Sequence, residues 1–86
     1  MGYKLKITKL AIKDAKKLEQ NGLDKKAIKL LKIISINPYQ SPPPLEKLKG
    51  FSNIYSRRIN IQHRLLYEIH EKDEIIKVLR MWTHYE

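Results

Sequence analysis

Arginine and histidine side chains gather in the last third of the chain, in a pattern that suits chemistry on a phosphodiester. Arg57 and Arg58 lie in one segment predicted to be a strand, Arg64 lies in the next, and His84 comes close to the last residue. The guanidinium groups are fixed cations, and an imidazole changes protonation near neutral pH. The chain contains no Cys. These groups suit phosphodiester cleavage better than acyl transfer or metal chemistry.

The composition limits the size and the class of the protein. A chain of 86 residues is expected to form one domain over positions 1–86. Lys and Arg total 18 against 9 Asp and Glu, a formal net charge of +9, which favours a nucleic acid, an anionic membrane or an acidic protein as partner. The absence of Cys excludes disulfides and thiolate zinc sites and fits the cytoplasm. No apolar run approaches the roughly 20 residues that span a bilayer, and the N-terminus lacks a hydrophobic signal region, so we expect a soluble cytoplasmic protein.

The N-terminal half predicts a strand followed by two helices. Apolar and polar side chains alternate from Tyr3 to Thr8, as in a half-buried strand. Thr8 can cap a helix over residues 9–20, whose apolar side is interrupted by Asp14, and Asn21-Gly22 can end it. A stronger stripe of helical period follows at Leu23, Ala27, Leu30, Leu31 and Ile34. Pro38 closes this second helix, and the tight turn makes the two helices antiparallel.

The C-terminal half predicts a sheet. Residues 40–44 form a stiff linker ending in three prolines, and residues 45–50 are a possible short strand. Three further strand-like segments cover about 54–59, 63–70 and 74–82, and their short connections imply an antiparallel meander. The predicted fold is α+β, in the order β-α-α-β-β-β with one more short strand. Two antiparallel helices cover one face of a small twisted antiparallel sheet, and the other face is left for function.

Side-chain alternation places arginines on the sheet itself. Arg58 shares a face with Ser56, whereas Arg57 points to the opposite side, and an arginine on a partly covered face needs an anionic partner. A purely structural interpretation also fits, in which Arg58 or Arg64 pairs with Glu46, Glu68 or Glu74 and only supports the fold. By the same reasoning His84 is a surface histidine, Trp82 and Tyr85 pack against the fold, and the helix lysines form a solvated face.

Three motifs taken together are specific. They are the run Pro42-Pro43-Pro44-Leu45-Glu46-Lys47-Leu48, the paired segments Ser56-Arg57-Arg58-Ile59 and His63-Arg64-Leu65-Leu66-Tyr67, and the terminal His84-Tyr85. This pattern resembles the YoeB/Txe toxins, a branch of the RelE/ParE superfamily of toxin–antitoxin systems. The resemblance covers about half of the chain, from Pro38 onward. In the N-terminal half only the strand-helix-helix order agrees.

The resemblance implies a RelE-like fold and a ribosome-dependent endoribonuclease that cuts messenger RNA in the A site, without a metal or other cofactor. The RNA 2′-hydroxyl is the expected nucleophile. The expected catalytic groups are a base, a phosphate-binding cation and an acid, at Glu46, Arg64 and His84 respectively. The expected substrate-binding residues are Lys49, Arg57, Arg58 and Tyr85.

The resemblance also implies partners. The chief one is a cognate acidic antitoxin of the YefM/Axe type, partly disordered before it binds. The others are the ribosome and messenger RNA. DNA would be met only indirectly, through the toxin–antitoxin complex, and a homodimer is possible. No membrane partner is expected.

Two other functions fit the same residues. A toxin of the ParE branch would inhibit DNA gyrase with the same fold and no acid–base pair, although the combination of Glu46, Arg64 and His84 argues against it. A non-enzymatic RNA- or ribosome-binding module would use the positive charge and the interleaved aromatic side chains of Tyr55, Tyr67, Trp82 and Tyr85. Membrane-surface binding fits least, because the helices lack a bulky aromatic face.

Overall fold

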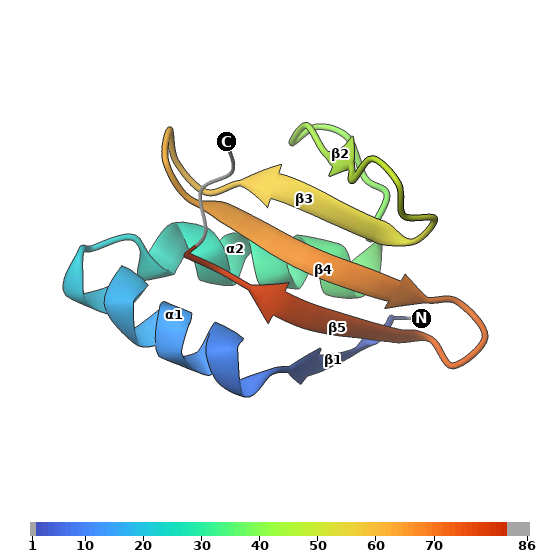
Figure 1. Ribbon diagram of the computed structural model, residues 1–86, viewed down its shortest axis with the longest axis horizontal. Coiled ribbons are helices and arrows are strands. Elements are labelled where there is room, and N and C mark those ends of the chain that lie inside the picture. The colour runs from blue at the N-terminus through green and yellow to red at the C-terminus, as the bar shows by residue number, and fades with distance from the viewer. Residues whose placement is uncertain (1, 83–86) are drawn as a thin grey trace.

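A five-stranded sheet backed by two helices makes up residues 2–82, the part of the chain that the computed structural model describes (Figure 1). The order along the chain is β1 (Lys4–Ile7), α1 (Lys9–Gln20), α2 (Asp24–Ile36), β2 (Glu46–Lys47), β3 (Ile54–Arg58), β4 (Arg64–His70) and β5 (Ile75–Arg80). In the sheet the strands follow the order β1-β5-β4-β3-β2. The predicted α+β arrangement is confirmed.

The sheet is mixed rather than antiparallel throughout. β2, β3, β4 and β5 form the predicted antiparallel meander. β1 instead pairs parallel with β5, from Lys4 opposite Ile75 to Ile7 opposite Val78. Alternation of apolar and polar residues is the same in parallel and antiparallel strands, so the pattern at residues 3–8 could not reveal this direction.

The helix ends follow the local signals in the sequence. The Thr8 hydroxyl accepts a hydrogen bond from the Ala11 N–H at 3.1 Å, which satisfies one of the unpaired donors of the first turn of α1. Gly22 has a φ of +71° immediately after α1, a conformation that glycine adopts without steric cost. α2 ends at Ile36, two residues before Pro38.

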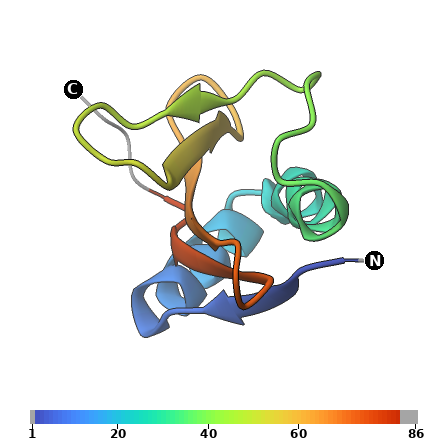
Figure 2. The same cartoon turned by 90° about the vertical axis from the view of Figure 1, so that its right-hand side faces the viewer.

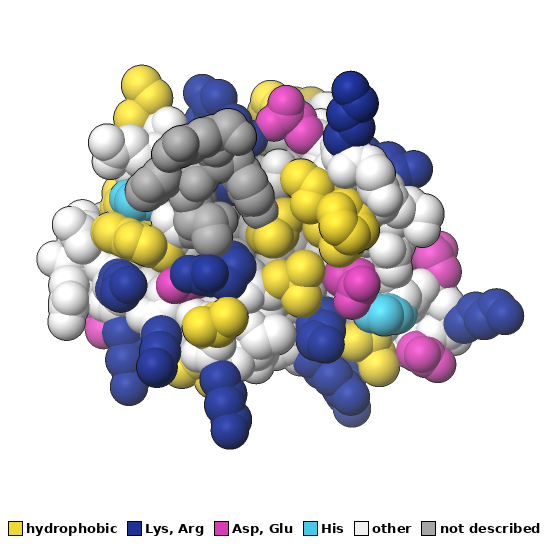
Figure 3. All heavy atoms as spheres, in the orientation of Figure 1, with side chains coloured by type: hydrophobic (Ala, Val, Ile, Leu, Met, Phe, Trp, Pro, Cys, Tyr) yellow, Lys and Arg dark blue, Asp and Glu magenta, His cyan; other side chains and the backbone are white. Residues whose placement is uncertain are grey.

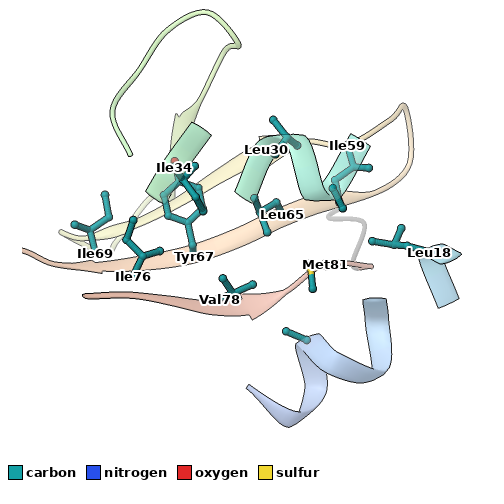
Figure 4. Close-up of a cluster of buried hydrophobic side chains, with 12 residues drawn as sticks. Leu18, Leu30, Ile34, Ile59, Leu65, Tyr67, Ile69, Ile76, Val78 and Met81 are labelled. Atoms are coloured by element: carbon teal, nitrogen blue, oxygen red, sulfur yellow. The ribbon is translucent and has the colours of Figure 1, made fainter. Parts of the chain in front are cut away.

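The core lies between the sheet and the helices (Figures 2 and 4). Ala27, Leu30 and Ile34 of α2 are buried there, as the apolar stripe predicts. Leu65, Tyr67 and Ile69 of β4 face them, and Ile76 and Val78 come from β5. Figure 1 shows α2 lying behind the sheet, so the opposite face of β2, β3 and β4 is left uncovered by helices.

Asp14, which interrupts the apolar side of α1, is buried with an ion-pair partner. Its carboxylate lies 2.7 Å from Arg80 Nε and also accepts the Met81 N–H at 3.0 Å. Burial alone would raise the pKa of Asp14, but the bonds from Arg80 and Met81 outweigh this effect and lower the pKa. The predicted alternation of β5 breaks nearby. The register of β4 and β5 shifts between Leu66 and Tyr67, and Met81 becomes the buried residue at the strand end.

Within residues 2–82, neither helix has the length and apolar character needed to cross a membrane.

Candidate active site

A carboxylate and an arginine from distant parts of the chain meet on the face of the sheet opposite α2. Glu46 Oε1 accepts a hydrogen bond from Arg64 Nη1 at 2.7 Å, although the two residues are 18 positions apart. The strand register explains the contact. Glu46 lies opposite Ser56, and Arg58 lies opposite Arg64, and residues directly opposite in an antiparallel pair project from the same face.

These residues line a cavity of about 380 Å³. Its lining consists of Pro43, Pro44, Glu46, Ser56, Arg58 and Arg64. Arg58 and Arg64 stand directly across from each other, and like charges in that arrangement are destabilising. One carboxylate offsets only one of these charges, and Arg58 has no ion-pair partner within residues 2–82. The cavity is therefore a site where an anion such as a phosphate would be stabilised.

The Glu46–Arg64 pair is accessible from solvent. The Glu46 side chain is 70% exposed and the Arg64 side chain 25% exposed. An exposed ion pair typically contributes about 0–1 kcal/mol to stability. An anion that enters the cavity can therefore displace Glu46 from the Arg64 guanidinium at little cost.

Three other predicted site residues are not among the described residues that line the cavity. Lys49 is exposed in the turn after β2 and does not line the cavity. His84 and Tyr85 lie outside the described residues. Ser56 and the prolines at 43 and 44 line the cavity but were not predicted as site residues, although the alternation had placed Ser56 on the face of Arg58.

The burial of Arg57 argues against the prediction that this residue binds substrate. It is 1% exposed and lies among core residues on the helix side of the sheet. Its guanidinium donates hydrogen bonds to the Tyr67 hydroxyl at 3.0 Å and to the carbonyl oxygens of Pro43 and Pro38 at 2.7 and 3.0 Å. A side chain held in this way has no surface to offer an RNA phosphate. The alternation had placed Arg57 on the same strand face as Tyr55 and Ile59, and such large apolar neighbours indicate a buried face.

The described residues, 2–82, contain no cluster of three or more His, Cys, Asp or Glu side chains that could hold a metal ion. Lys and Arg side chains protrude around the edge of the face that carries β3, β4 and β5 (Figure 3). Of the residues that the structure describes, those that bring charge to the cavity are Arg58, Arg64 and Glu46.

Comparison with known proteins identifies the family. The model of the YoeB-like toxins of bacterial type II toxin–antitoxin systems matches residues 7–85. The chain belongs to this family. It is similar to the toxin YoeB of Synechocystis sp., with 38% identity over 88 residues that cover 96% of this chain and 98% of that protein.

Solved structures agree with this assignment. The YoeB dimer from Staphylococcus aureus superimposes with a TM-score of 0.82 at 36% identity, over 96% of this chain and 98% of that one. The YoeB-YefM complex from the same organism contains a chain with a TM-score of 0.79 and the same identity and coverage. The family match extends the resemblance from the motifs after Pro38 back to β1. The protein is a toxin of a type II toxin–antitoxin system.

Proposed function

We propose that this toxin is a ribosome-dependent endoribonuclease that cuts messenger RNA in the A site and thereby stops translation. One observation carries the proposal. An accessible carboxylate and two arginines, brought together by three strands, line a single cavity of about 380 Å³. Family membership supports the same activity, because YoeB toxins are generally endoribonucleases.

The reaction needs no external nucleophile. The 2′-oxygen of the RNA attacks the adjacent phosphorus, a P–O2′ bond forms, and the P–O5′ bond breaks. Glu46 takes the proton from the 2′-hydroxyl, and His84, as imidazolium, gives a proton to the departing 5′-oxygen. The products are a 2′,3′-cyclic phosphate, or the 3′-phosphate after hydrolysis, and a 5′-hydroxyl.

The arginines stabilise the charge that develops on the phosphoryl oxygens. Arg64 exchanges its bond with Glu46 for a non-bridging phosphate oxygen, and Arg58, directly across β3 and β4, binds beside it. The planar guanidinium fork suits this task because it can donate to two oxygens at once. Tyr85 stacks on or orients a base, and Lys49 reaches a flanking phosphate.

We further propose that catalysis is independent of metal, because the guanidinium groups supply the charge that a metal ion would otherwise supply. A phosphorothioate at the cut position tests this point. A metal ion bound to the replaced oxygen would make cleavage of the sulfur-containing messenger recover when Mn²⁺ is added, since Mn²⁺ accepts sulfur ligands more readily than Mg²⁺. We expect Mn²⁺ to restore no activity.

The proposed partners follow the same logic. A YefM-type antitoxin would place acidic side chains over Arg58 and Arg64, and its binding should weaken with salt. The YefM complex of the Staphylococcus aureus relative supports this expectation, and its YoeB dimer supports a homodimer for this chain. DNA would be bound through the antitoxin complex, and a membrane has no part in the proposal.

The test uses purified toxin and ribosomes programmed with a defined messenger RNA, with primer extension to map the cuts. Arg64→Ala and His84→Gln should lose cleavage and retain antitoxin binding. Lys72→Ala removes one positive charge from the exposed β4–β5 turn and should cleave like the unmodified protein. Stalled translation on uncut messenger would indicate a non-enzymatic binder instead. Loss of gyrase supercoiling with intact messenger would indicate a ParE-like activity.

A further inference from the structure

A second cavity adjoins the candidate active site and shares two of its residues. It encloses about 240 Å³ and is lined by Lys26, Lys29, Leu30, Ile33, Pro43, Arg58 and Ile59. Pro43 and Arg58 line the first cavity as well. Among residues 2–82, the charged side chains of this lining are three cations, with no Asp or Glu. These three cations would attract a bound anion.

The lining combines cations with an apolar floor. Lys26 and Lys29 are three residues apart on α2, so they lie on neighbouring parts of one helix face. Leu30 and Ile59, both largely buried, supply apolar surface to the same lining. A nucleotide has the matching character, with an apolar base face and an anionic phosphate. A strand running from the first cavity into the second would pass the Arg58 guanidinium.

We propose that the second cavity binds the nucleotide adjacent to the cut in single-stranded messenger RNA, with its phosphate held by Lys26, Lys29 and Arg58. The proposal rests on the proposed nuclease function and adds to it a substrate contact made by α2. Ribosomal RNA is the competing ligand for these lysines, and the test below separates the two.

The test measures binding of a short RNA oligonucleotide that carries 2′-deoxyribose at the cut position, so that it binds and is not cleaved. The Lys26→Ala/Lys29→Ala double variant should bind roughly tenfold more weakly, with a salt slope smaller by about 0.7 for each phosphate that is no longer neutralised. The Lys25→Ala/Lys32→Ala variant is the matched control. It removes the same charge from the same helix, at positions outside the cavity lining, and should change affinity less than about twofold.

Three results would overturn the subsite. Equal weakening of RNA binding in both double variants would mean that the lysines act only through their overall positive charge and not through contacts in the cavity. Failure of the unmodified toxin to bind the oligonucleotide would overturn the subsite. A defect seen with ribosomes and absent with the oligonucleotide would assign the lysines to ribosomal RNA. If the predicted contrast appears and the toxin still cuts no messenger, the subsite stands and the nuclease proposal fails.

The buried Arg57 carries a second, independent inference. Its two Nη groups donate to the carbonyls of Pro38 and Pro43, five residues apart in the segment that joins α2 to β2. Figure 2 shows this segment leaving α2, passing around the sheet edge and entering β2. Proline has no N–H, so the run of prolines at 42–44 offers the fold only acceptors. A side chain with several donors can fix such a segment.

Tyr67 completes this anchor. Burial raises the pKa of Tyr67 although Arg57 opposes the effect, so its hydroxyl keeps its proton. That hydroxyl donates to the Pro38 carbonyl at 2.8 Å while it accepts from Arg57 Nε. The anchored Pro43 is three residues before Glu46, and β2 spans only two residues. The hydrogen bonds of so short a strand hold Glu46 only weakly in its position.

We infer that Arg57 is a positioning residue that holds the 38–43 segment on the sheet and so keeps Glu46 against Arg64. This inference also rests on the proposed nuclease function. Arg57→Gln keeps a polar side chain and removes the guanidinium fork. Its kcat should fall at least roughly tenfold with KM little changed, because a small misplacement of a catalytic group has effects of that size. Arg57→Lys, which keeps one donor group, should recover part of the activity.

Amide hydrogen exchange separates positioning from general loss of stability. The Leu48 N–H, bonded to the Ile54 carbonyl at 2.8 Å, should exchange faster in Arg57→Gln, while amides shared by β4 and β5 stay protected. If Arg57→Gln does not fold, Tyr67→Phe removes only the hydroxyl and should show a milder form of the same pattern. Tyr3→Phe, which removes an exposed bond to Glu71, is the control for removing a tyrosine hydroxyl. Unchanged kcat, or faster exchange throughout the sheet, would refute the inference. An inactive unmodified toxin would instead refute the nuclease function.

Discussion

Two arginine–carboxylate pairs with the same 2.7 Å separation should respond in opposite ways to mutation. Arg64–Glu46 lies at the surface, with side chains 25% and 70% exposed. In Arg80–Asp14 the carboxylate is 2% exposed. Water and salt screen the first pair, whereas removing Arg80 would leave a buried charge without its partner. The distance alone therefore does not tell which pair supports the fold.

Arg64→Ala should cost less than about 1 kcal/mol of unfolding free energy, because exposed pairs contribute about that much at most. For a domain of this size the melting temperature would fall by no more than about 4–8 °C. The same change should lower cleavage by about 10²–10³-fold, the loss typical when one donor to a developing negative charge is removed. A small effect on stability combined with a large effect on rate is the signature of a substrate-binding arginine.

The assay pairs urea unfolding, followed by circular dichroism, with the single-turnover rate of messenger cleavage on programmed ribosomes. The cleavage rate is measured under conditions in which Arg64→Ala is folded. Lys72→Ala again controls for the removal of one positive charge. A stability loss of several kcal/mol with cleavage reduced only in proportion to the unfolded fraction would show that Arg64 supports the fold, and the reasoning would be refuted.

Three further predictions concern stability and can be checked by equilibrium unfolding. Asp14→Ala should cost about 2–4 kcal/mol of unfolding free energy, because it removes the buried ion pair with Arg80 and takes the carboxylate acceptor from the Met81 N–H; a cost below about 0.5 kcal/mol, the range of ordinary surface changes, would contradict the assigned role. The pKa of Asp14 in the folded protein lies below its ordinary value of 3.8, so the ionised carboxylate stabilises the fold fully above that pH, and this stabilisation is lost as the pH falls through the folded pKa. Asp14→Asn should therefore make the unfolding free energy depend less on pH in the acid range. An unchanged pH dependence would contradict the assigned role of Asp14. Gly22→Ala places a side chain at a φ of +71° and should cost about 1 kcal/mol despite the open space around it; a neutral result would argue against strain at this turn.

The helices could be predicted from the sequence because their signals are local. The cap at Thr8, the glycine after α1 and the apolar stripe of α2 each act within a few residues of the chain. The parallel pairing of β1 with β5 joins residues about 70 positions apart, and no pattern at either strand encodes it. The buried pairing of Asp14 with Arg80 spans a similar separation, so the sequence showed Asp14 only as an irregularity in a helix stripe.

The site shows the same division. Alternation put Ser56 and Arg58 on one face, and the motif resemblance proposed Glu46 with Arg64, but only the register of β2, β3 and β4 brings these residues into one cavity. Arg57 lies in a basic motif, which predicted a substrate contact, although its place on one strand face with Tyr55 and Ile59 indicates burial. Its burial depends on carbonyls of a proline-rich segment whose path no local signal specifies.

Cleavage of messenger RNA with a single 2′-deoxyribose at the cut position is the most direct test of the mechanism. Paired with an all-ribose messenger on the same ribosomes, it varies only the proposed nucleophile. We predict that the ribose messenger is cut to a cyclic or 3′-phosphate and a 5′-hydroxyl and that the substituted one stays intact at that position. Cutting of both messengers at equal rates would contradict the mechanism.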